Sequence, residues 1–162
     1  MPPTSDIGSP LADASADTAR TAVLGFSTFN DLTARAAQKR TSQWTLGKNA
    51  DHSGPLGPIV TADEVGDLRD GLRIRTRVNG TVVQDGTSKD MLFELGETLS
   101  HISHTLTLNP GDILCTGTPD GVGYARTPEW LLQPGDIVEV EVEKLGTLTN
   151  PIVSNQHRIG PR

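Results

Sequence analysis

The chain of 162 residues has the size of one domain, and its 35% hydrophobic and 4% aromatic content predicts a modest core built mainly from Val, Leu and Ile. Its net charge of −6 argues against nucleic acid or an anionic membrane surface as a partner. The single cysteine excludes an intrachain disulfide, and with no signal-like or membrane-spanning apolar run we expect a cytoplasmic location.

The first part of the chain predicts an arm followed by a folded domain. Residues 1–14 are rich in Pro, Ser, Asp and Ala without hydrophobic periodicity, so we expect a mobile N-terminal arm. Ser15 predicts the N-cap of a short helix, and residues 23–29 predict a strand. We place the domain at residues 15–155 and a C-terminal tail at residues 156–162.

A second helix is predicted over residues 31–40, which are mostly strong helix formers. In such a helix Asp31, Arg35 and Gln38 share one face, because they are spaced by four and three residues. One interpretation is a site where a carboxylate, a guanidinium and an amide meet. The other is an exposed helix face with an Asp N-cap and an Asp–Arg pair. The residues alone favour the second interpretation. The Gly- and Pro-rich residues 41–58 then predict a long loop of functional importance.

The middle of the chain predicts a hairpin and the most amphipathic helix. Residues 72–78 alternate apolar and polar side chains, and Asn79-Gly80 turns the chain back into residues 81–84. Residues 88–106 place Leu and Ile at spacings of three and four, so we expect one helix over that range. Its opposite face has residues at metal-ligand spacing that we interpret as solvated, namely Glu94, Glu97, His101 and His104.

The last third predicts short strands around a glycine-rich loop. We expect strands over residues 113–116, 137–142 and 147–153, and the loop at residues 117–123. Cys115 is expected to point into the core as a packing residue, since no His is placed as its base. Short strands with two isolated helices, without regular strand–helix alternation, predict an α+β, mostly β fold.

Two loops contain residues suited to an anionic ligand. Lys48 follows Gly47 in the long loop, from which an ammonium group can reach an anionic substrate. Thr116, Thr118 and the backbone N–H groups of the glycine-rich loop can offer hydrogen bonds to a carboxylate, although the Gly-Lys-Ser/Thr of a nucleotide-binding loop is missing. An isolated lysine and a plain tight turn are the competing interpretations.

Six segments, in this order, resemble successive motifs of the fumarylacetoacetate hydrolase family. They are GFSTFNDLTAR (25–35), WTLGK (44–48), PLGP (55–58), VNG (78–80), TGTP (116–119) and LGTLTNP (145–151). The resemblance runs from about Asp6 to Val153. It implies the fold of that family's C-terminal catalytic domain, in which mixed β-sheets form a β-sandwich roll.

The resemblance also implies a site and a chemistry. Asp31 matches a ligand of a divalent cation, Mg²⁺ or Mn²⁺, while Arg35 and Gln38 match neighbours of the substrate. Lys48 matches the active-site lysine, and Thr118 matches a threonine that holds the substrate carboxylate. The implied enzyme acts on a 2-oxo or β-diketo acid, or on a dicarboxylate, through a metal-stabilised enolate. Hydrolysis, decarboxylation and isomerisation share that intermediate, and a homodimer is expected.

The chain departs from the family pattern in two places. Family members usually carry a Glu-x-Glu pair upstream, which supplies two further metal ligands, and a lid with a His–Glu pair. We find neither here and expect that the N-terminal part is lacking. Beyond Lys48, the family more often has Ser, Phe and Thr where this chain has Asn49, Ala50 and His52. The alternative is therefore a non-catalytic fragment of this fold, or an oligomerisation module.

Overall fold

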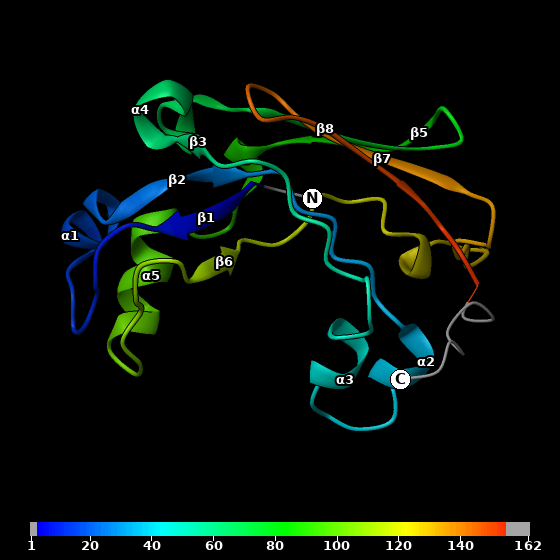
Figure 1. The fold of residues 1–162 in the computed structure, drawn as a ribbon, viewed down its shortest axis with the longest axis horizontal. Helices are drawn as coiled ribbons and strands as arrows, with labels where there is room; N and C mark the ends of the chain where they lie inside the picture. The colour runs from blue at the N-terminus through cyan, green and yellow to red at the C-terminus, as the bar shows by residue number, and fades with distance from the viewer. Residues whose placement is uncertain (1–2, 155–162) are drawn as a thin grey trace, which may run out of the picture.

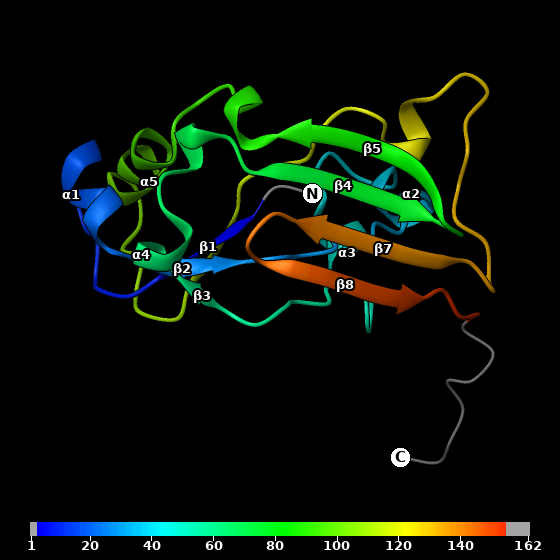
Figure 2. The ribbon, with the colours of Figure 1, turned by 90° about the horizontal axis from the view of Figure 1, so that it is seen from above.

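The computed structural model describes residues 3–154 and contains two four-stranded antiparallel sheets with short helices. The sheets are offset along the long axis of the molecule, with α1 and α5 at one end and α2 and α3 below the other (Figures 1 and 2). This architecture confirms the predicted α+β, mostly β class. The tail predicted at residues 156–162 lies outside the described residues.

The first sheet has the strand order β3-β2-β1-β6. The bounds of these strands are Val60–Thr61, Val23–Ser27, Thr4–Ile7 and Ile113–Cys115. Strand β1 is buried along its whole length and pairs with β2 on one side and β6 on the other. The prediction of a mobile arm is therefore wrong for this segment. Its sequence shows no hydrophobic period because polar side chains fill three of the four positions.

The second sheet has the strand order β5-β4-β7-β8. The bounds are Thr81–Thr87, Arg73–Val78, Ile137–Val142 and Gly146–Pro151. The β4–β5 hairpin confirms the prediction, because Asn79 and Gly80 have φ values of 50° and 79°, as a tight hairpin turn requires. In β7 the valines are buried, while Glu141 on the opposite face pairs with Arg77 at 2.8 Å.

The helices are short. Their bounds are α1 Ala16–Thr21, α2 Arg35–Gln38, α3 Thr45–Lys48, α4 Ala62–Val65 and α5 Leu95–Ser103, with 3-10 turns η1 Leu68–Asp70, η2 Ser88–Asp90 and η3 Gly123–Ala125. Ser15 caps α1 as predicted, since its hydroxyl accepts a hydrogen bond from the Thr18 N–H at 3.3 Å. No helix within residues 3–154 is long and apolar enough to cross a membrane.

Helix α5 begins seven residues later than the hydrophobic spacing predicts. The Glu94 N–H donates to the Glu97 carboxylate at 3.3 Å, which satisfies a backbone donor before the first turn and fixes the start of the helix. Leu92, which the spacing assigned to the apolar stripe, is 93% exposed. The cap therefore decides where this helix begins.

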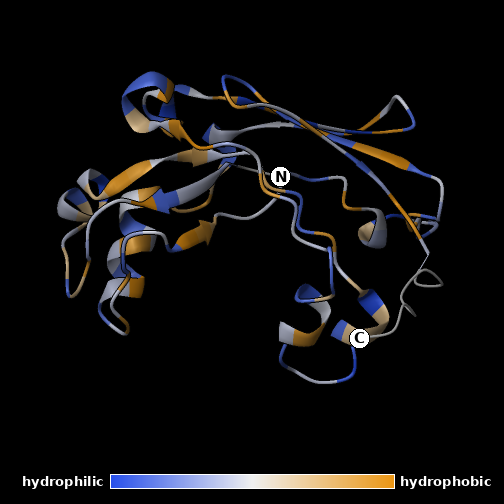
Figure 3. Ribbon diagram, viewed as in Figure 1, coloured by the Kyte–Doolittle hydropathy of each residue, from blue (hydrophilic) through white to orange (hydrophobic). Residues whose placement is uncertain are grey.

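The main core lies where the two sheets, α1 and α5 meet. It contains Ile7 and Phe26 from the first sheet, Ile74 and Val142 from the second, and Leu99 from α5. A smaller cluster in the second sheet contains its remaining buried valines, Val78, Val138 and Val140. Figure 3 shows apolar residues on the strands and polar residues in many of the connecting turns.

Candidate functional site

A hollow of about 310 Å³ lies between the second sheet, α3 and the glycine-rich loop. Its walls combine apolar side chains of the second sheet with polar groups from four separate segments. The polar groups that matter below are Asp31, Arg35, Lys48, Gln84, Thr118 and Tyr124. The structure thus brings together four of the five predicted site residues, which are up to 87 positions apart in the sequence, from Asp31 to Thr118.

Asp31 and Lys48 form an ion pair in this hollow, and their side chains are 24% and 32% exposed. Asp31 lies in an irregular segment after β2. The N–H groups of Asn30 and Leu32 donate to the carbonyls of Pro55 and Ser53 at 3.0 and 3.1 Å. The prediction of a helix beginning at residue 31 is wrong here. Backbone hydrogen bonds to the facing loop, and not helical ones, hold this segment up to the start of α2.

Arg35 and Gln38 lie together on α2. The Arg35 Nη1 donates to the Gln38 Oε1 at 2.8 Å, and the guanidinium lies 5.2 Å from the centre of the Tyr124 ring. Gln38 is 7% exposed and does not line the hollow, so it lies behind Arg35 and orients it. The expected common face of Asp31, Arg35 and Gln38 is not formed, because α2 begins only at Arg35.

Gly47 explains how Lys48 reaches the hollow. A Cβ atom at Gly47 would lie 2.5 Å from the Gln38 Cβ, so α3 packs against α2 at a distance that only glycine allows. The Ala34 N–H donates to the Gly47 carbonyl at 2.9 Å and ties the two segments together. Lys48 is the last residue of α3 and points toward Asp31.

Thr118 extends from the glycine-rich loop, which crosses β5. Its hydroxyl accepts a hydrogen bond from the Gln84 Nε2 at 3.0 Å. Sequence reasoning missed Gln84, which looked like an ordinary hairpin residue, and Tyr124. The signal for Tyr124 was available, because it is the only tyrosine of the chain and follows the glycine-rich loop directly.

Cys115 is exposed and lines the hollow, so the expectation that it packs in the core is wrong. Strand β6 lies at the edge of its sheet and leaves both Ile113 and Cys115 exposed, with Leu114 facing inward. Partial burial of the thiol, and then the negative charge of Asp31, raise the pKa of Cys115, while Lys48 opposes the shift. A thiol with a raised pKa is a poor nucleophile at neutral pH.

The described residues of the hollow offer one carboxylate ligand for a divalent cation. Asp31 provides a carboxylate in the hollow, but no group of three or more His, Cys, Asp or Glu residues within residues 3–154 is arranged to hold a metal ion. Mg²⁺ prefers six oxygen ligands and is usually held by one or two carboxylates together with substrate and water. The described residues therefore do not make a metal site by themselves.

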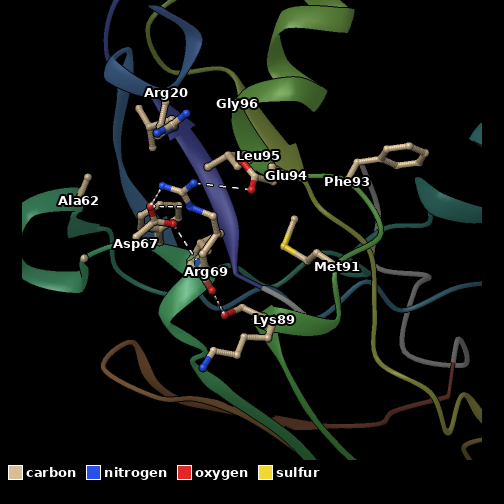
Figure 4. A pocket seen from close by; sticks show the side chains of 15 residues that line it. Arg20, Ala62, Asp67, Arg69, Lys89, Met91, Phe93, Glu94, Leu95 and Gly96 are labelled. Atoms are coloured by element: carbon tan, nitrogen blue, oxygen red, sulfur yellow. Dashed lines mark hydrogen bonds and ion pairs between the residues drawn. The ribbon is translucent and has the colours of Figure 1, made fainter. Parts of the chain in front are cut away.

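A second hollow, of about 410 Å³, lies between α1, α5, η1 and η2 (Figure 4). Its most prominent charged group is Arg69, whose guanidinium bonds to Asp67 at 2.5 Å and lies 3.6 Å from Glu94. The Arg69 guanidinium is thus already paired with carboxylates, and none of the predicted site residues lines this hollow. We therefore place the candidate site in the hollow that contains Lys48.

Known proteins resemble the chain over nearly its whole length. A family model described as fumarylacetoacetate (FAA) hydrolase C-terminal matches residues 6–153. The 2,4-didehydro-3-deoxy-L-rhamnonate hydrolase of a Sphingomonas species is 42% identical over 154 residues, which are 93% of this chain and 54% of that protein. The oxaloacetate tautomerase of Bacillus subtilis is 40% identical over 130 residues, which are 80% of this chain and 43% of that protein.

A solved structure shares the fold. The fumarylpyruvate hydrolase of Pseudomonas aeruginosa, in complex with Mn²⁺ and pyruvate, matches with a TM-score of 0.84 and 29% identity. The match covers 93% of this chain and 63% of that one. The chain spans about half the length of the curated relatives that it matches.

Proposed function

The chain belongs to the fumarylacetoacetate hydrolase family, and on that basis we propose that it forms the substrate-binding half of an enzyme acting on 2-oxo or β-diketo acids. The observation that supports this most is the convergence of Asp31, Lys48, Arg35 and Thr118 on one hollow. The hollow has both apolar and polar walls, and a small acid with a short carbon chain suits such a mixture.

Lys48 is proposed as the residue beside the reacting carbonyl. Its ammonium is held by Asp31 at the end of α3, so it is positioned before a substrate arrives. A fixed positive charge in a partly enclosed hollow stabilises negative charge that develops on a carbonyl oxygen when a C–C bond breaks or a proton leaves. Thr118 and Arg35, on other walls of the hollow, are proposed to hold the carboxylate groups of the acid.

Asp31 is proposed as one ligand of a divalent cation, Mg²⁺ or Mn²⁺, with the remaining protein ligands supplied from outside the described residues. The cation, when bound, would act as a Lewis acid and stabilise negative charge on the substrate oxygens. The fumarylpyruvate hydrolase structure, which contains Mn²⁺ and pyruvate, supports the use of a divalent cation by similarity. Among the relatives are a hydrolase and a tautomerase, so the choice between hydrolysis, decarboxylation and isomerisation stays open.

The proposal is tested by titrating the ¹⁵N-labelled full chain with pyruvate in the presence of Mg²⁺ and following backbone resonances. We expect the resonances of residues around Lys48 and Thr118 to shift together. Lys48→Met should weaken pyruvate binding roughly tenfold, because a hydrogen bond from a charged group contributes about 1.5–3 kcal/mol. The far-ultraviolet circular dichroism spectrum should be unchanged.

Lys89→Met is the matched control, because it removes the same charge from a residue that lines the other hollow. It should leave pyruvate binding unchanged. Equal loss in both variants would show that only net charge matters and would refute the site. Absence of any pyruvate-dependent shift would favour the alternative, a non-catalytic module of this fold.

A further inference from the structure

The Gln84 side chain makes three hydrogen bonds, two to the glycine-rich loop and one within the second sheet. Its Nε2 donates to the Thr118 Oγ1 at 3.0 Å and to the Pro119 carbonyl at 2.9 Å. Its Oε1 accepts from the Thr76 hydroxyl at 2.8 Å, and Thr76 is the residue opposite Gln84 in the β4–β5 ladder. Both amide hydrogens of Gln84 are therefore used.

The orientation of this amide is determined by its partners. Oxygen and nitrogen of a glutamine side chain are assigned from the hydrogen-bond network. The Pro119 carbonyl can only accept, so the Gln84 nitrogen must face it, and the oxygen must then face Thr76. Gln84 consequently presents an N–H group to the Thr118 hydroxyl in every arrangement that keeps the contact with Pro119.

A hydroxyl group that accepts one hydrogen bond keeps its own proton for another partner. Because Gln84 donates to the Thr118 oxygen, the Thr118 proton is directed to a different acceptor, and Thr118 lines the hollow. We propose that Gln84 is a positioning residue that makes Thr118 a hydrogen-bond donor toward a substrate carboxylate. This inference rests on the proposed function of the hollow.

The loop does not depend on Gln84 alone for its position. The Arg126 Nη2 donates to the Val83 carbonyl at 2.6 Å and to the Gly121 carbonyl at 3.1 Å. Gly121 also lies so close to β5 that a Cβ there would be 2.3 Å from the Val83 oxygen. A change at Gln84 should therefore leave the loop on the strand and alter mainly the direction of the Thr118 hydroxyl.

Two substitutions separate hydroxyl direction from packing. Gln84→Met keeps the length of the side chain but removes the donor, so pyruvate binding should weaken roughly three- to tenfold. Gln84→Glu keeps the acceptor for Thr76 and places a carboxylate that accepts the Thr118 proton, so binding at about pH 7 should weaken more than in Gln84→Met. As the pH falls toward about 5, protonation of the introduced carboxyl should restore part of the affinity in Gln84→Glu only.

Pyruvate affinity in the presence of Mg²⁺ is measured by resonance shifts for the full chain and for both variants. Gln133→Glu is the control, because it makes the same charge change at an exposed residue that does not line the hollow. A purely structural role for Gln84 predicts lower melting temperatures with equal pyruvate affinity at every pH, and that result would overturn the inference. Equal affinity loss in Gln84→Glu and Gln84→Met, without pH-dependent recovery, would also overturn it.

A measurement without ligand separates this inference from the proposed function. In the free chain, Thr118→Val should shift one of the two Gln84 side-chain N–H resonances and leave the other, which bonds to Pro119, in place. If neither resonance changes, the hydrogen bond is absent and the inference fails by itself. If the hydrogen bond is present but the wild-type chain binds no pyruvate, the proposed function fails and the role of Gln84 fails with it.

Discussion

Asp6 lies in the middle of β1 with its carboxyl group buried, and the residue is 3% exposed. The Ser27 hydroxyl donates a hydrogen bond to the Asp6 Oδ2 at 3.0 Å. Burial raises the pKa of Asp6, although the hydrogen bond from Ser27 acts in the opposite direction. Nearby, the hydroxyl oxygens of Ser5 and Thr28 are buried without a hydrogen-bond partner in the described structure. Backbone pairing therefore holds this strand although the polar groups of Ser5 and Asp6 are costly to bury.

The raised pKa of Asp6 predicts a pH dependence of stability. The folded chain binds this proton more tightly than the unfolded chain, so the contribution of Asp6 is fully present below the pKa of the unfolded state, about 3.9, and is lost as the pH rises through the folded pKa. Asp6→Asn removes the titration. The stability of the variant relative to wild type should therefore increase as the pH rises from about 4 to about 7, as urea unfolding can measure.

Asp120→Asn provides the control for this experiment, because Asp120 is exposed in the glycine-rich loop. Its stability difference from wild type should show no such upward trend with pH. If the difference in unfolding free energy between Asp6→Asn and wild type stays constant across this pH range, burial does not penalise the Asp6 carboxylate in the folded chain.

At the scale of elements, the helices depend on particular contacts more than on helix propensity. Helix α5 packs on α1 at Gly96, where a Cβ atom would lie 2.6 Å from the Ala16 carbonyl oxygen. A contact this short with the backbone of another helix cannot be relieved by rotating a side chain. Helix α3 approaches α2 at Gly47 in the same way, so glycine positions both helix pairs.

Gly96→Ala tests this packing directly. In a solvated helix, replacing glycine by alanine stabilises by roughly 0.5–1 kcal/mol. Here we expect the opposite sign, a destabilisation of about 1–3 kcal/mol, because α5 must move away from α1. Thermal and urea unfolding measure the change. His101→Ala, on the exposed face of the same helix, should be nearly neutral, and a stabilised Gly96→Ala would contradict the close packing.

At the scale of the whole molecule, two offset sheets leave apolar side chains exposed. Leu92 and Phe93, between η2 and α5, are 93% and 69% exposed, and Trp44 beside α3 is 63% exposed. The edge strands β3, β6, β5 and β8 also present unpaired backbone groups at the sides of the sheets. Surfaces of this kind are usually covered by another chain or domain.

We therefore keep the prediction of a homodimer. Light scattering at tens of micromolar should give about twice the mass of the chain, and Phe93→Ser should shift the population toward monomer because it removes apolar area from the exposed segment. Val82→Ser, at an exposed position of the hairpin, should have little effect. A monomer throughout the concentration range would contradict the prediction, and equal effects of both substitutions would place the contact elsewhere.

The sequence by itself determined the family, the fold class, the β4–β5 hairpin and the cap of α1, because each depends on residues that are neighbours in the chain or on an ordered series of motifs. It also indicated Asp31, Arg35, Lys48 and Thr118 through that series, although their roles stay predictions. Only the tertiary structure placed β1 at the centre of a sheet, because pairing on both sides outweighs its polar side chains. Contacts between distant segments likewise packed Gln38 against Gly47 and joined Gln84 to Thr118, and the edge position of β6 left Cys115 exposed. Periodicity in the sequence describes one element at a time, so it carries no information about such contacts.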